Sequence, residues 1–187
     1  MNKAVPKKLV EECLNIAVQA PSATNTQKWR FFVFSKAEKK NVISRYYKKS
    51  FSIYLSDTKK NRNVNTKSTN NAKIIESAKF LADNMEKVPL FLLFCVEGAI
   101  DKASLGQQAS GYGSILPAAW SFMLAARSRG LGCCWTTLHL RYADQVAAEL
   151  SIPKELTQVA LLPVAFYSGS SFKKAKRQPL ETVVTWD

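Results

Sequence analysis

Residues 88–96 form the apolar run VPLFLLFCV, and this run constrains the fold more than any other part of the chain. A short, continuous apolar run is typical of a strand that neighbouring elements cover. A second run, Trp29–Phe34 (WRFFVF), is aromatic and nearly continuous, and it predicts a strand that is buried on both faces. The 88–96 run is therefore expected to be a central strand of a sheet.

The rest of the chain mixes helical and strand patterns. Pro6 suits the first turn of a helix that ends at Pro21, and Ser35 with Glu38 forms a capping-box signature for the next helix. Asp57–Asn71 is polar and is expected to be a long mobile loop. We further expect helices over 74–85, 115–126 (charge-free and buried) and 143–150, strands over 133–140 and 157–167, and a β-like end at 183–186. The order predicts a mixed α and β chain with about four or five strands, in one domain, 1–187.

Charge and cysteine usage limit the partners and the compartment. Lys and Arg total 27 against 14 Asp and Glu, a net charge of +13, which favours anionic partners. The four cysteines form no CxxC pair, so reduced thiols in a cytoplasmic protein are the simpler interpretation. No export signal is visible, and the apolar part of the longest charge-free stretch is shorter than the roughly 20 residues that cross a bilayer. No membrane partner is expected.

The familiar catalytic and nucleotide-binding motifs are absent. Gly111-Tyr112-Gly113 lacks the third glycine of a dinucleotide-binding turn, and a single histidine, His139, leaves no His-rich metal site. If 133–139 is a strand, Cys133 and His139 share a face but lie too far apart to act as nucleophile and base. Buried structural thiols and a partly solvated histidine are the better interpretation. We therefore expect no metal and no catalytic side chain, which leaves chemistry carried by a bound cofactor.

Three segments together resemble the FMN-dependent nitroreductase family. The first is APSATNTQKW at 20–29, which is similar to the family pattern A-P-S-x-x-N-x-Q-P-W and lies between a helix and a buried strand. The second is the helix LPAAWSFMLA ending in RGLG, with its continuation WTTLHL at 135–140. The third is the tail FKKAKRQPL at 172–180, followed by Trp186. These segments span nearly the whole chain.

The resemblance implies an α+β fold with a central, mostly antiparallel sheet flanked by helices. It also implies a homodimer with FMN at the subunit interface, and NAD(P)H as co-substrate. The activity it implies is ping-pong hydride transfer through flavin N5 to a small-molecule acceptor such as a nitroaromatic or a quinone. By resemblance, the flavin-binding residues are Pro21, Ser22, Ala23 and Asn25 of the partner subunit, Thr136, Thr137 and Leu138 near N5, and Lys176 and Arg177 at the phosphate.

Two features depart from the family pattern. The family opens with an Arg-Ser-x-Arg start that binds the FMN phosphate, whereas this chain opens MNKAVP. Lys3, Lys7, Lys8 and the 173–177 cluster would compensate in part for the missing phosphate contacts. The stretch 36–73 holds 11 basic and 2 acidic residues, 11 − 2 = +9 of the total charge. That stretch is either a cationic rim that steers an anionic substrate or a solubilising surface.

Two other functions stay open. One is a flavin-dependent dehydrogenase in a biosynthetic pathway, in which the flavin oxidises a small metabolite or peptide. The other is a non-catalytic protein that has lost FMN and binds a polyanion through 36–73. Few aromatic residues alternate with the lysines there, so nucleic acid is not an expected partner.

Overall fold

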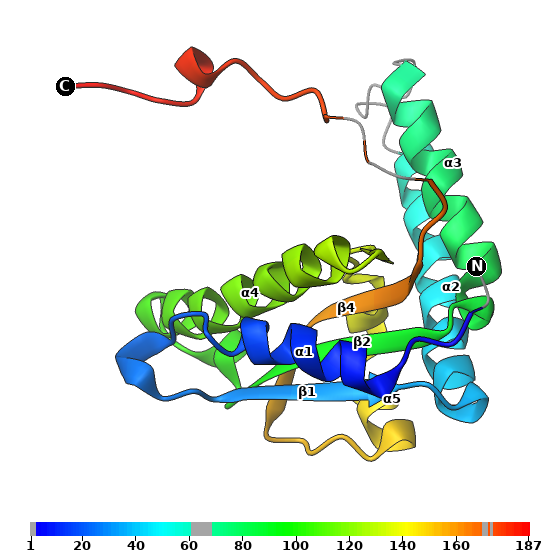
Figure 1. Ribbon diagram of the computed structural model, residues 1–187, viewed down its shortest axis with the longest axis horizontal. Coiled ribbons are helices and arrows are strands. Elements are labelled where there is room, and N and C mark those ends of the chain that lie inside the picture. The colour runs from blue at the N-terminus through cyan, green and yellow to red at the C-terminus, as the bar shows by residue number, and fades with distance from the viewer. Residues whose placement is uncertain (1–2, 61–68, 170–171, 173) are drawn as a thin grey trace.

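The computed structural model describes residues 3–60, 69–169, 172 and 174–187. Its centre is a four-stranded antiparallel sheet in the order β1-β2-β4-β3. The strands are β1 (Trp29–Phe34), β2 (Leu90–Glu97), β3 (Leu131–Cys133) and β4 (Leu156–Phe166). Every residue of β2 except Glu97 is buried, which confirms the expected central strand. The sheet flanked by helices confirms the expected α+β class (Figure 1).

Alternate residues of β2 belong to two different cores, because successive side chains of a strand point to opposite faces. Leu92 and Phe94 pack with α1 (Lys7–Ala17) and α4 (Leu105–Ser128). Leu93 and Cys95 pack with α2 (Ala37–Lys60) and α5 (Ala143–Leu150), and α3 (Thr69–Asn84) supplies Ala82 to the same core. Helices therefore cover both faces of the sheet.

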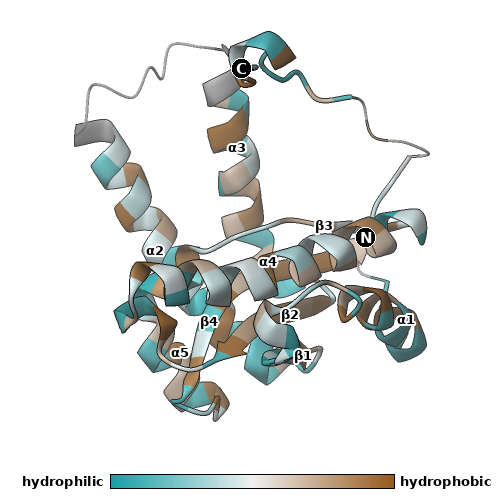
Figure 2. Cartoon of the chain, turned by 90° about the vertical axis from the view of Figure 1, so that its left-hand side faces the viewer, coloured by the Kyte–Doolittle hydropathy of each residue, from teal (hydrophilic) through white to brown (hydrophobic). Residues whose placement is uncertain are grey.

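Helices α2 and α3 extend well beyond the sheet as a pair (Figure 2). The polar stretch 57–71 was expected to be one loop, but α2 continues to Lys60 and α3 begins at Thr69. The rest of that stretch, 61–68, lies outside the described residues. Each helix is anchored in the core by other turns, through Phe51 of α2 and Ala82 of α3, and extending a formed helix costs less than starting one, so the polar residues continue it.

Helix α4 begins with a complete capping box formed by Ser104 and Gln107. The sequence predicted a buried helix, but only one side of it is buried. Leu116, Trp120 and Leu124 are 37%, 56% and 49% exposed. These three residues recur every four positions and so form one apolar stripe on the outer face of α4.

Strand β1 is not buried on both faces, as its aromatic run predicted. It lies at the edge of the sheet, with Arg30 exposed and Val33 45% exposed. Arg30 pairs instead with Glu97 at the end of β2. An edge position leaves one side of a strand to solvent, whatever the hydropathy of its sequence.

The predicted strand over 133–140 is wrong for most of its length. Strand β3 ends at Cys133, Thr136 forms a single bridge to Leu161, and the 3-10 helix η4 (Leu138–Tyr142) follows. Contacts between η4 and α2 turn the chain inward and bury His139 completely. The first helix also ends earlier than expected, at Ala17, and the β-like end 183–186 has no strand partner.

Within the described residues, no helix is long and apolar enough to cross a membrane.

Candidate functional site

The loop 22–27 has an unusual backbone. Thr24, Asn25 and Gln27 have φ angles of 48°, 54° and 51°, in the left-handed region that non-glycine residues rarely occupy. Asn25 tolerates this region, but Thr24 and Gln27 each cost about 1–2 kcal/mol there, so the surrounding structure must hold the loop in place. Backbone strain of this kind gathers at binding and catalytic sites.

Ser114 of α4 holds this loop. Its Oγ accepts a hydrogen bond from the Ala23 N–H at 3.0 Å, and its carbonyl accepts from Trp29 Nε1 at 2.9 Å. Within the loop, Ser22 Oγ accepts from the Gln27 N–H at 3.0 Å. One helix residue thus fixes both the loop and the start of β1. Sequence reasoning missed Ser114, because a serine inside a charge-free helix carries no local signal.

The four predicted flavin residues of this region lie on or beside the loop, at the surface. Pro21 and Asn25 are exposed, while Ser22 and Ala23 are half-buried. The Asn25 side chain accepts a hydrogen bond from Gln27 Nε2 at 2.9 Å, which leaves its amide nitrogen free to donate outward. The loop therefore presents polar groups to solvent.

The second predicted segment, 136–138, lies beside β4. Thr136 is 7% exposed, and its backbone exchanges two hydrogen bonds with Leu161, at 3.0 and 2.9 Å. Its side chain points toward Tyr47, where burial raises the pKa of the phenol and the hydrogen bond to Thr136 opposes that rise. Leu138 packs into the core beneath α2, and Thr137 is exposed. Of the three, only Thr137 presents its side chain to solvent.

The third predicted pair, Lys176 and Arg177, lies on the C-terminal arm, which we define as residues 172 and 174–187. The arm leaves the body after β4 and runs away from it (Figure 1). Phe172 stands at its start and packs on Tyr167, with 4.7 Å between the two ring centroids. The guanidinium carbon of Arg127 lies over the Phe172 ring, 5.1 Å from its centroid. Both predicted phosphate ligands are exposed, and no described hydrogen bond joins them to the body. The structure therefore does not bring the three segments together within one chain.

His139 and the cysteines offer no reactive pair. His139 is fully buried rather than partly solvated, both ring nitrogens lack a partner among the described residues, and burial lowers its pKa to about 4. Burial raises the pKa of Cys133 to about 12, so its thiol stays protonated at neutral pH. No cluster of three or more metal-ligating side chains occurs within the described ranges.

Several basic residues of 36–73 have structural partners. Lys40 is buried and donates to the Val88 carbonyl at 2.6 Å, while Arg45 pairs with Glu149 and Lys48 with Glu86. Lys49 lies over the Tyr142 ring. Four basic side chains of the described part of 36–73 thus have contacts within the chain, and the choice between a cationic rim and a solubilising surface stays a prediction.

Comparisons with known proteins agree with the sequence resemblance. The model of the Nitroreductase family matches residues 1–166. The Bacillus subtilis protein YodC, named as an NAD(P)H nitroreductase, is 26% identical over 99% of this chain and 90% of its own length.

Solved structures share the fold. A BluB-like flavoprotein from Clostridium difficile has a TM-score of 0.71 at 20% identity, covering 100% of this chain and 91% of its own. Iodotyrosine deiodinase bound to FMN and 3-iodo-L-tyrosine has a TM-score of 0.73 at 21% identity, and the match covers 96% of this chain and 89% of the deiodinase chain. A Desulfovibrio desulfuricans protein in complex with FMN has a TM-score of 0.69 at 16% identity, covering 100% and 88%. The family match over most of the chain confirms the predicted resemblance: this chain belongs to the nitroreductase family.

Proposed function

We propose that this protein is an FMN-dependent oxidoreductase that uses NAD(P)H. The observation that carries the proposal is the loop 22–27, in the segment that carries the family signature. Three non-glycine residues of this loop are in left-handed conformations, and Ser114 anchors the loop through the Ala23 N–H. Family membership and the FMN-bound structural neighbours support the same conclusion. When bound, FMN supplies the redox chemistry: it accepts hydride from NAD(P)H in one half-reaction and reduces a nitroaromatic, quinone or similar acceptor in the other.

The predicted donor set fits FMN in kind. The exposed amide of Asn25 and the hydroxyl of Thr137 suit ring heteroatoms and ribityl hydroxyls. Arg177 suits the phosphate because its guanidinium binds two phosphate oxygens at once, and Lys176 adds a point charge. In this proposal the protein's own groups bind, orient and neutralise the cofactor, and no side chain acts as acid, base or nucleophile.

The site requires a second copy of the chain. The three predicted segments lie apart in one chain, and the C-terminal arm carries Leu180, Val183 and Trp186 at 70%, 62% and 86% exposure. The apolar stripe of α4 is exposed as well. Apolar side chains left open in two places favour burial against another chain. We therefore propose a homodimer in which Pro21, Ser22, Ala23 and Asn25 of one copy complete the flavin site of the other.

Titration with FMN tests this function. The purified protein should retain a flavin absorbance band after gel filtration, and NADH or NADPH should bleach it under anaerobic conditions. R177Q should weaken FMN binding by roughly tenfold or more, because a charge-assisted pair to phosphate is lost. K79Q removes the charge of an exposed lysine on α3, outside the proposed site, and is the matched control that should bind normally. Protein that stays colourless at saturating FMN contradicts the proposal.

A further inference from the structure

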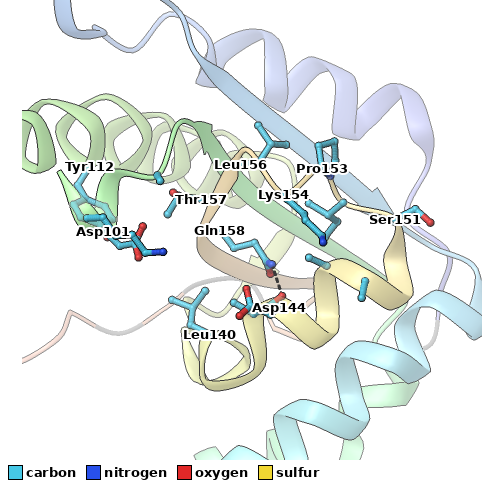
Figure 3. A pocket seen from close by; sticks show the side chains of 16 residues that line it. Asp101, Tyr112, Leu140, Asp144, Ser151, Pro153, Lys154, Leu156, Thr157 and Gln158 are labelled. Carbon is cyan, nitrogen blue, oxygen red and sulfur yellow. Dashed lines mark hydrogen bonds between the residues drawn. The ribbon is translucent and has the colours of Figure 1, made fainter.

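Two cavities differ in what their walls offer. One, of about 890 Å³, lies between α5, η4 and the start of β4 (Figure 3). Its buried polar side chain, Gln158, donates to the Ala143 carbonyl at 2.8 Å, and the remaining amide oxygen is closed to the cavity. The other, of about 190 Å³, lies between the C-terminal half of α4 and β3, and Phe172 of the C-terminal arm lines it. Small-molecule sites measure roughly 300–1,000 Å³, so this second cavity has room for a side chain rather than a ligand.

Phe172 is held between two side chains of the body. Its ring centroid lies 4.7 Å from that of Tyr167, and the guanidinium carbon of Arg127 lies over its face at 5.1 Å. Both distances are in the range of favourable aromatic and cation–π pairs, and each contact of this kind is worth about two- to tenfold in an equilibrium constant. Together the two contacts favour the docked ring by roughly tenfold.

Both partners of the ring are fixed in the body. The Tyr167 N–H donates to the Gly130 carbonyl at 3.4 Å, and a Cβ added at Gly132 would lie 3.5 Å from the Tyr167 Cβ, so that β3 and Tyr167 are in close contact. Arg127 stands in the last turn of α4, where a cation is favourable, and it forms no ion pair with a described residue. Phe172 therefore docks on a surface that is already formed.

Beyond Phe172, the arm makes its hydrogen bonds only with itself. Every hydrogen bond described for 174–187 joins two residues of that range. Arg177 follows Phe172 by five residues, so it lies within about 18 Å of the docked ring. Without the ring, the nearest described contact with the body is at Tyr167, twice as far along the chain. The volume open to Arg177 then grows about three- to eightfold, between the limits of a flexible and an extended chain.

The cavity that Phe172 lines is continuous with the apolar stripe of α4. Trp120 and Leu124 belong to both. In the proposed homodimer this stripe faces the second copy of the chain. The docked ring therefore starts the arm at the edge of that interface.

We propose that Phe172 is a positioning residue for the FMN phosphate. Its ring, docked between Tyr167 and Arg127, restricts the start of the arm so that Lys176 and Arg177 meet the phosphate. The inference rests on the proposed function, and it adds a residue that touches neither the cofactor nor an acceptor.

Titration of FMN into F172A tests the proposal on the full chain. We expect the Kd for FMN to rise about three- to eightfold, in proportion to the volume open to Arg177. F172Y keeps a ring and should stay within about twofold of the natural protein. F80A is the matched control, because Phe80 is 70% exposed on α3, and it should change nothing.

The background K176Q/R177Q separates positioning from a direct role. If Phe172 acts only through these two cations, adding F172A to that background should change the Kd by less than about twofold. A full loss in that background would mean that Phe172 acts on the cofactor by another route, and it would overturn the proposal. An unchanged Kd in folded F172A would overturn it as well.

Trypsin cleavage after Lys174, in protein without FMN, tests the docking by itself. A protease binds several extended residues on each side of the cut bond, so Phe172 must leave Arg127 before cleavage. F172A and R127Q should both be cut at least about threefold faster than the natural protein. Equal rates would show that the ring is not docked and would overturn the proposal.

Circular dichroism and thermal melting establish that each variant is folded. If F172A does not fold, R127Q decides through the same two measurements, because it alters an exposed side chain. Natural protein that binds no FMN would contradict the proposed function itself. Natural protein that binds FMN, with an unchanged Kd in the variants, would contradict only the role of Phe172.

Discussion

The loop 22–27 and the C-terminal arm both belong to the family resemblance, but their contacts within the chain are opposite. The loop is strained and is fixed by Ser114, which joins it to α4. The arm bears the proposed phosphate ligands, yet beyond Phe172 its described residues are nearly all exposed. The chain itself therefore preorganises one half of the proposed flavin site. In our proposal the partner subunit and FMN order the other half.

Removal of the arm should have the largest effect. A chain ending before residue 174 keeps every residue of both cores, so each single chain should still fold. We expect it to lose FMN retention and dimerisation completely. Gel filtration with absorbance detection measures both. A shortened chain that still holds FMN would mean that the loop side alone makes the site.

Lowering the pH should destabilise the body, where His139 is buried, and should leave the arm unaffected. Burial lowers the pKa of His139 to about 4, so between about pH 6.5 and 4 the unfolded chain binds a proton that the folded chain does not. Stability should therefore be full above about pH 6.5 and fall by about 3 kcal/mol as the pH drops to about 4. Urea unfolding across this range measures the loss. H139L should flatten the profile, and an unchanged profile in folded H139L would contradict the assignment.

S114A should release the loop. The variant leaves the half-buried Ala23 N–H without its acceptor, at a cost of about 1 kcal/mol. We expect weaker FMN binding together with lower stability, measured by flavin titration and urea unfolding. S110A is the matched control, because Ser110 contributes only its backbone carbonyl to Ser114 Oγ. Equal FMN affinity in S114A and S110A would show that the loop is not preorganised by α4.

Glycine substitutions in the loop should produce the smallest effects, and their signs should differ. T24G places glycine at φ 48° and relieves strain, whereas T26G places it at φ −73°, where glycine adds freedom to the unfolded chain. Each variant also removes one threonine hydrogen bond to the Ala23 carbonyl, so that loss is matched between the two. We expect T24G to be neutral or stabilising, and T26G to cost about 0.5–1 kcal/mol. Thermal melting compares them, and the opposite order would contradict the strain argument.

The sequence predicted the elements whose pattern reflects the local environment. The central strand β2 and helix α5 lie where hydropathy and spacing placed them. Errors arose where tertiary position overrides pattern: β1 is aromatic yet lies at an edge, and 133–140 leaves the sheet so that His139 enters the core.

For the candidate site too, local sequence motifs were predictive, whereas contacts between distant residues were not. Motif comparison predicted the loop and the arm, but the contribution of Ser114 depends on a contact between residues 23 and 114, which no local pattern encodes. The inward side chain of Thr136 depends on its bridge to Leu161 for the same reason. The assignments of the nine flavin residues and of one domain over 1–187 stay predictions.

Light scattering combined with flavin absorbance reports the mass and the cofactor content of the same particle, and so tests whether two chains hold FMN between them. We expect a yellow particle with twice the mass of one chain and one FMN per chain, which separates into colourless monomers when the arm is removed. A yellow particle with the mass of a single chain, or a dimer that stays colourless at saturating FMN, would contradict it.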